Sequence, residues 1–366
     1  MTDEQGDDAL ESAFGFDGTW REFAPIAFTN LLLTIVTLGV YRFWATARER
    51  RYLWSHSRFV DERLEWAGIG LELFIGGMLA LLLFVAPYFL AIQVAQALAL
   101  RGQELLGALV VLGALVFLFY VYGLARYRAL RYRLSRTRWR GIRGGSEDPG
   151  FTYALTYMWK TAAGMLPAGL LIPWSMVSLW NDRWNRLSFG PYRFEANAEA
   201  GGLFARFLLF YAAPFVFMFV VTFAAFAFGG IAAIAGGFDP ESTNPIVFVV
   251  VFLVMIIGFY LVFGLVAMAF YAKFFRDAVG ATRWDDIEFQ FNARTRDWLK
   301  LLLGDIGLVL VTLGIGMIFL GYRHWKFFMT HMEASGEIVL DRLTQSTTPV
   351  AGHGEGLLDA LDIGAV

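Results

Sequence analysis

The stretch FDGTWREFAPIAFTNLLLTIVTLGVYRFWATARERRYLWSHSRF, residues 16–59, recurs along the chain in two further versions. One starts at Phe151 and is the more divergent, and the other starts at Phe291 and keeps more of the pattern. Internal repeats guide the reading of architecture because each copy is expected to fold as one structural unit. The three versions therefore predict three related cores, separated by other segments.

Each core has a residue that disfavours a helix interior at the corresponding point. Gly39 follows Thr37 in the first core, Gly314 follows Thr312 in the third, and Pro173 takes this place in the second. Relative to alanine, glycine costs a helix roughly 1 kcal/mol and proline about 3 kcal/mol. Each core is therefore predicted to be an apolar segment, a break and a basic, aromatic helix.

Long apolar runs between the cores identify the class of protein. Of the 366 residues, 57% are hydrophobic, and the mean hydropathy is +0.54. Uncharged runs occupy 73–100, 105–125, 207–238 and 242–272. About 20 apolar residues cross the hydrocarbon core of a bilayer, and each run reaches that length. The sequence therefore predicts a multi-spanning membrane protein whose four full spans form two hairpins.

Short pieces with alternating apolar and aromatic residues flank the cores. They lie at 64–66, 137–139, 192–194, 282–291 and 338–340. Alternation of this kind is typical of β-strands. Small β elements are therefore predicted beside the helices, including a strand at 337–341.

Basic residues are concentrated in five stretches, whereas the short turns at 101–104 and 239–241 lack this excess. The basic stretches are 46–63, 126–143, 182–193, 273–300 and 322–342. Lysine and arginine near membrane ends favour the cytoplasmic side. If each core enters the membrane and returns, all five stretches and both termini are cytoplasmic. If each core crosses once, the chain has seven spans and 273–300 lies outside, so the first arrangement is preferred.

The predicted fold class is an all-α polytopic membrane protein with three internal repeat units and short cytoplasmic β elements. It has four full spans plus three re-entrant or interfacial helical hairpins, with seven spans as the alternative. A bent backbone at membrane depth must be buried in protein or line a wet cavity, so the cores are expected to pack against the spans. The predicted segments are an acidic disordered tail without a secretory signal (1–13), core 1 (14–68), a transmembrane hairpin (69–125), a basic segment (126–150), core 2 (151–200), a second transmembrane hairpin (201–272), a basic segment with core 3 (273–342) and a disordered tail (343–366).

The first core carries a recognisable series of motifs. It reads Phe16-Asp17-Gly18-Thr19-Trp20, Asn30-Leu31-Leu32-Leu33-Thr34, Thr37-Leu38-Gly39-Val40-Tyr41 and Phe43-Trp44, followed by a basic run and His56. This series resembles the YjgN-like family of bacterial inner-membrane proteins of unknown function, and the resemblance extends over residues 14–342. It implies an inner-membrane location and supplies no activity or catalytic residues. The middle core departs from the motif, with Pro173-Trp174 in place of Leu-Gly.

An arginine-rich stretch follows the first transmembrane hairpin. Its members are Arg126, Arg128, Arg131, Arg133, Arg136, Arg138, Arg140 and Arg143. Arginines with aromatic neighbours routinely anchor a membrane protein at the interface, which is the simpler interpretation. The functional interpretation is recognition of anionic lipid headgroups, which basic pockets on the cytoplasmic face can bind. Nucleic acid is not expected as a partner of a membrane-embedded chain.

Three polar side chains are expected within or near membrane-embedded segments. Asn30 and Asp305 take corresponding positions in cores 1 and 3, and Glu72 opens the first span. Charged groups in the membrane are costly and therefore mark sites by default, although the cost falls near an interface. These residues define a possible intramembrane polar site.

No motif of enzymatic chemistry is present in the sequence. The chain has no cysteine, and His56, His324 and His331 lack the tight spacing of metal ligands. Nucleotide-binding loops, nucleophile elbows and paired carboxylates are absent from the sequence as motifs. We therefore expect no enzyme, no cofactor and no metal.

Two functions remain open at this point. The first is a non-enzymatic inner-membrane protein that binds anionic lipid, a protein partner or a second copy of itself through its basic cytoplasmic face. The alternative is a transporter or channel with a site formed by the broken cores around Asn30 and Asp305, since broken helices build many transporter sites.

Overall fold

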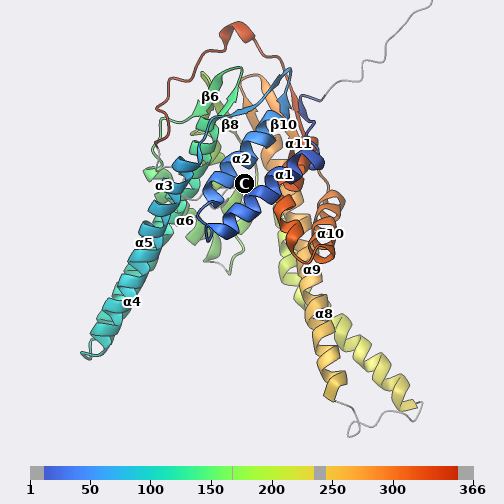
Figure 1. Cartoon of the computed structure of the whole chain (residues 1–366). Helices are drawn as coiled ribbons and strands as arrows, with labels where there is room; N and C mark the ends of the chain where they lie inside the picture. Colours follow the sequence, from blue (N-terminus) through green and yellow to red (C-terminus); the bar gives the residue numbers. More distant parts are fainter. Residues whose placement is uncertain (1–11, 167, 235–244, 353–366) are drawn as a thin grey trace, which may run out of the picture.

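Helical hairpins and a layer of short strands make up the computed structural model, which describes residues 12–166, 168–234 and 245–352 (Figure 1). The helices of every hairpin begin and end next to strands along the chain. The strands lie together at one end of the molecule, and two long hairpins extend away from them (Figure 1). The ends of all the hairpins therefore lie at one layer of strands.

The three cores form the short hairpins. They are α1 (Trp20–Val36) with α2 (Arg42–Ser55), α6 (Phe151–Met165) with α7 (Ile172–Trp184), and α10 (Thr295–Val311) with the 3-10 segment η3 (Ile315–Phe319) and α11 (Leu320–His331). Because the strands that precede and follow each core lie in the same layer, the ends of a core are on one side of the molecule.

The long hairpins contain four helices that are long and apolar enough to cross a membrane. These stretches are Gly70–Ala99, Glu104–Arg136, Gly201–Ala224 and Phe252–Gly280. The first combines α3 (Gly70–Ala80), the π-helical turn η1 (Leu81–Val85) and α4 (Ala86–Ala99), and it packs on α5 (Glu104–Arg136). Pro87 has no N–H to donate, and the widened turn η1 comes just before it. The other hairpin pairs α8 (Gly201–Ile234) with α9 (Pro245–Gly280).

The all-α fold class predicted above is wrong, because the short strands join into an extensive antiparallel layer. One sheet has three strands, β1 (Phe14–Phe16), β2 (Ser57–Phe59) and β3 (Glu62–Arg63). In the other sheet of the described structure, each strand pairs with the next one along the chain. Its eight strands are β4 (Glu65–Trp66), β5 (Thr137–Trp139), β6 (Ile142–Gly145), β7 (Ser188–Phe189), β8 (Tyr192–Ala196), β9 (Thr282–Trp284), β10 (Ile287–Phe291) and β11 (Met332–Ser335). β8 and β9 pair although they are far apart in the sequence, and no local sequence pattern indicates such a pairing. The strand segments were therefore predicted as separate short elements.

The strand expected at 337–341 is also wrong. The last strand is β11, and a short 3-10 turn, η4 (Leu340–Arg342), follows it. β11 begins directly at the end of α11, so its pairing with β10 uses the residues closest to the helix. Within this stretch Ile338 packs on the hydrophobic core, whereas Val339 is 39% exposed.

Left-handed backbone conformations reverse the chain at the tip of each core. Leu38 and Gly39 have φ of 51° and 92°, and Leu313 and Gly314 have nearly the same values, 51° and 93°. In the middle core the reversal lies at 168–169 rather than at Pro173. Proline cannot adopt a positive φ but is tolerated in the first turn of a helix, and Pro173 lies there in α7.

Residues 343–352, which were expected to belong to a disordered tail, lie against the strands. The guanidinium of Arg143 donates to the carbonyl oxygen of Thr348 at 2.5 Å, and Arg136 donates to that of Ala351 at 3.2 Å. Ala351 is only 2% exposed. The acidic tail and the turn at 239–241 fall mostly or wholly outside the described residues.

Candidate functional site

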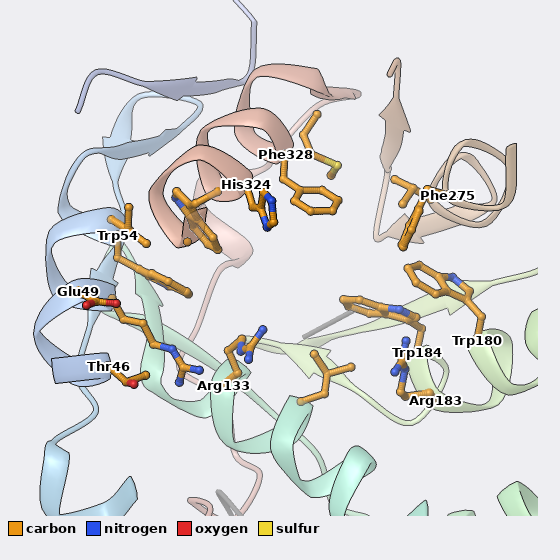
Figure 2. Close-up of a pocket in the computed structure, with 17 residues that line it drawn as sticks. Thr46, Glu49, Trp54, Arg133, Trp180, Arg183, Trp184, Phe275, His324 and Phe328 are labelled. Carbon is orange, nitrogen blue, oxygen red and sulfur yellow. The ribbon is translucent and has the colours of Figure 1, made fainter. Parts of the chain in front are cut away.

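A cavity of about 470 Å³, called here the central cavity, lies where the three cores meet (Figure 2). The second helices of the cores, α2, α7 and α11, supply most of its wall, and α5 and α9 supply the rest. Arg50, Trp180 and Trp325 are corresponding positions of the three cores, each eleven residues after the glycine of the left-handed tip, and all three line it. The repeat therefore brings one face of each core to a shared space.

Aromatic rings form two opposite walls of the central cavity. Trp54 stacks on Trp325 with ring centroids 4.1 Å apart, and Trp180 lies 5.6 Å from Trp184. Figure 2 shows Trp54 on one side and Trp180 and Trp184 on the other, with Phe328 of α11 between them. Aromatic side chains have few rotatable bonds, so such walls are rigid and apolar.

Three arginines bring positive charge to these walls. They are Arg50 of α2, Arg133 of α5 and Arg183 of α7. The Arg50 guanidinium lies over the Trp66 ring at 5.0 Å, and both Arg50 and Arg183 are 5% exposed. Glu49 is the carboxylate among the lining residues. The central cavity is therefore cationic and aromatic, which suits an anionic group with apolar parts.

Arg183 differs from the other two arginines because its side chain is incompletely partnered. Its Nε atom is buried and makes no hydrogen bond, and no carboxylate in the described parts of the chain forms an ion pair with it. The Trp180 ring lies 5.5 Å from its guanidinium carbon. Burial lowers the pKa of the guanidinium, yet arginine stays protonated in proteins. A buried charge of this kind is costly unless an anion accompanies it.

Asn30 and Asp305 do not line the central cavity, but each holds a residue that does. Asn30 Nδ2 donates to Glu49 Oε1 at 3.0 Å, and His324 Nε2 lies 2.7 Å from Asp305 Oδ2. Asp305 also accepts from Arg323 Nε at 2.6 Å. The expected polar pair thus forms a second layer behind the cavity wall.

Glu72 is engaged in a separate buried cluster. Its carboxylate accepts hydrogen bonds from Tyr132 at 2.8 Å and from Arg136 at 2.9 Å and 2.7 Å. Glu72 is 6% exposed. The cluster ties α3 to the end of α5 and does not reach the central cavity.

The eight arginines of 126–143 differ in their surroundings. Arg128, Arg136, Arg140 and Arg143 bind protein groups, Arg131 is buried, and Arg138 is exposed on β5. Only two of the eight line a cavity described here, Arg133 the central one and Arg126 another beside it. Arg50 and Arg183 were not singled out from the basic stretches 46–63 and 182–193 in which they lie.

Metal ligands do not cluster in the parts of the chain that the structure describes. Over these residues no group of three or more histidine, aspartate or glutamate side chains could hold an ion.

Comparison with known proteins places the chain in a family. The family described as "Bacterial protein of unknown function (DUF898)" matches residues 11–360. The chain belongs to this family. The inner membrane protein YjgN of Escherichia coli O157:H7 is 30% identical to this chain over 136 residues, which cover 37% of this chain and 31% of that protein. YjgN of Escherichia coli strain K12 is 29% identical over the same shares.

The YjgN-like resemblance is therefore confirmed. The matched region spans about a third of those relatives, whose names state an inner-membrane location and no activity. YjgN of Salmonella typhimurium is 30% identical over 70 residues, 19% of this chain and 18% of that protein. No solved structure matches the DUF898 chain.

Proposed function

We propose that this DUF898 chain is an inner-membrane protein that binds an anionic lipid without chemical conversion, and that the central cavity holds the anionic group. The observation that carries the proposal is Arg183, a buried guanidinium whose Nε has no hydrogen-bond partner, in the wall of an aromatic cavity. An anion at this point would neutralise a charge that burial otherwise makes costly. Arg50 and Arg133 reinforce the same preference.

The strand layer faces the cytoplasm in this proposal. The strands and adjoining helix ends carry the basic residues, which favour the cytoplasmic side. The tips of the cores are apolar and open: Leu38 is 95% exposed and Leu313 is 93% exposed. Leucines at such tips are costly in water and favourable in hydrocarbon. The short hairpins thus enter the membrane from the cytoplasmic side and return.

The proposal is tested by the lipids that the purified protein retains. The full chain is extracted in detergent, exposed to an equimolar mixture of phosphatidylglycerol and phosphatidylcholine, and examined by native mass spectrometry. We expect selective retention of phosphatidylglycerol. Arg183→Met should lower that retention at least about tenfold, since removing one partner of a buried charge pair costs about 2–5 kcal/mol.

The matched control is Arg193→Met, which removes an arginine that is exposed on β8 and paired with Glu147. It should leave lipid retention unchanged. Equal retention of both lipids by the wild type, or equal losses in the two variants, would contradict the proposal. A bound protein or a second copy in the spectrum, with no lipid, would point instead to the partner expected from the sequence.

Transport is the second candidate, and one observation favours it. Glu49 and His324 line the central cavity, and each contacts the residue behind it, Asn30 or Asp305. Titratable groups facing a shared cavity can carry protons in transporters. Proton flux into proteoliposomes that is lost in Glu49→Gln and His324→Gln would support transport. A flux no greater than that into protein-free vesicles would rule it out.

A further inference from the structure

A second cavity lies beside the central one and meets it at Arg183. This side cavity has a volume of about 420 Å³ and is lined by α5, α6, α7 and α9. Both cavities share Trp180, Arg183 and Phe275 as lining residues. Arg183 therefore stands at the junction of two spaces, each of a size typical of small-molecule sites.

The side cavity is polar at one end and apolar at the other. Arg183 lies at the end of α7 that leads into the strands, whereas Ile172 lies at the opposite end. At 1.5 Å per helical residue the two are about 16 Å apart. Arg126 and Tyr153 accompany the cationic end, and the opposite end adds Met165 of α6. The charged end is thus nearer the strand layer and the apolar end nearer the hairpin tips.

The ion pair inside core 2 does not involve Arg183. Asp182, the residue before Arg183, is paired instead with Lys160 of α6. Counted from the left-handed tips of the cores, Lys160 takes the place that Asp305 has in core 3. The carboxylate next to Arg183 is therefore engaged by another cation, and no ion pair of Arg183 is present in the described structure.

A second polar atom without a partner lies in the same place. The hydroxyl oxygen of Thr161, in the middle of the α6 wall, is buried and makes no hydrogen bond within the described structure. Buried polar atoms in proteins are nearly always hydrogen-bonded, so an exception indicates a missing partner. A ligand with polar atoms both at its charged group and farther along the cavity would supply partners for Arg183 and for Thr161.

Resting on the proposed function, we propose that the ligand is a phosphate-bearing amphiphile that enters from the bilayer. Its phosphate lies against Arg183, and its hydrocarbon chain extends through the side cavity past Met176 toward Ile172. This orientation matches a phospholipid of the cytoplasmic leaflet, whose headgroup faces the strand layer. A free phosphate compound from the water phase shares the anionic chemistry but would leave the apolar end of the side cavity empty.

The test compares two ligands and two tryptophan variants in the full-length chain. Binding of phosphatidylglycerol in mixed micelles and of glycerol 3-phosphate in the same detergent is measured by titration. Met176→Trp fills the apolar end of the side cavity. Met218→Trp makes the same change at an exposed position of α8 and is the control.

We expect the wild type to bind phosphatidylglycerol at least about tenfold more tightly than glycerol 3-phosphate, because each buried methylene adds affinity. Met176→Trp should remove most of this advantage and leave glycerol 3-phosphate binding unchanged, and Met218→Trp should alter neither. Comparison of the two ligands on the wild type alone keeps the test valid if Met176→Trp does not fold.

Two results would overturn the inference while leaving the proposed function standing. One is equal affinity of the wild type for both ligands, which would show that the hydrocarbon chain of the lipid gains nothing from the side cavity. The other is unchanged phosphatidylglycerol binding in a folded Met176→Trp protein. If neither anion binds the wild type, the proposed function itself fails, and the inference fails with it.

Discussion

His324 Nε2 lies 2.7 Å from Asp305 Oδ2, and the corresponding positions of the first repeat, Glu49 and Asn30, are also in contact, at 3.0 Å. In both cores, a side chain of the first helix thus holds a cavity-lining side chain of the second. We expect Asp305→Leu to lower the free energy of unfolding by about 1–3 kcal/mol, because Arg323 and His324 lose their acceptor. Thermal unfolding in detergent measures the change.

The matched variant is Asp305→Asn, which copies the residue of the first repeat. It keeps an acceptor oxygen for Arg323 and should therefore lose less than half as much stability. The Arg323 side chain is 33% exposed, so solvent moderates both effects. Equal losses in the two variants would show that the hydrogen bonds do not stabilise the hairpin.

The Glu72 cluster predicts a larger effect on stability. Glu72→Ala removes the partner of Arg136, and the two side chains are only 8% and 11% exposed. Breaking a buried ion pair by removing one partner costs about 3–5 kcal/mol. Arg193→Ala, which breaks an exposed pair with Glu147, should cost less than about 1 kcal/mol. Similar losses in the two proteins would contradict the assigned burial of the cluster.

The left-handed turn predicts opposite effects for two glycines of core 3. Gly314 has a φ of 93°, whereas Gly307 lies inside α10, and a Cβ at either site would meet no atom within 4 Å. Gly314→Ala should destabilise the protein by about 1 kcal/mol or more, since alanine resists positive φ. Gly307→Ala should be neutral or stabilising by up to about 1 kcal/mol. A stabilising Gly314→Ala would contradict the turn.

The contact between Arg143 and residues 346–348 predicts local protection at the end of the described chain. Arg143→Ala removes the hydrogen bond to the Thr348 carbonyl oxygen. We expect faster hydrogen exchange at residues 343–352 while the helices keep their protection. The control is Arg138→Ala, which changes an exposed arginine on the adjacent strand. Equal exchange in the two variants would show that Arg143 does not hold this segment.

The short cores predict a distinctive labelling pattern, because the chain has no native cysteine. A cysteine at Arg138 on β5 should react with an impermeant reagent from the cytoplasm, and one at Gln103 in the α4–α5 turn should react from the other side. A cysteine at Leu38 should react from neither side, since the proposed topology puts this tip in hydrocarbon. Reaction of Leu38→Cys from the side opposite Arg138 would show that the first core crosses the membrane.

Local sequence was sufficient to predict the four apolar helices and most of the strands. The length of an apolar run identifies a membrane span because the thickness of the bilayer fixes how many helical residues are needed to cross it. The Thr-Leu-Gly triplet contains the glycine that a left-handed turn needs. The pairing of β8 with β9 and of β10 with β11 depends on helices that return to one layer, which no local pattern records. The fold class was therefore predicted wrongly, although the apolar helices and most of the strands were predicted correctly.

The site proposed at Arg183 was not predicted from the sequence. Density of charge drew attention to residues 126–143, and four of those eight arginines bind other parts of the protein. Arg183 lies in a less basic stretch, and it matters to the proposal because its buried Nε has no hydrogen-bond partner in the described structure. The neighbouring carboxylate of Asp182 is paired with Lys160, and only the packing of α6 and α7 reveals that Arg183 Nε has no partner in the described structure.

The most direct test of anion binding at Arg183 is a cryo-electron microscopy map of the wild-type chain in nanodiscs that contain phosphatidylglycerol. The account predicts phosphate density within hydrogen-bonding distance of the Arg183 guanidinium, continuous with chain density in the side cavity between α6 and α7. A map in which a protein carboxylate or carbonyl group meets Arg183, with both cavities closed or filled only by water, would contradict it.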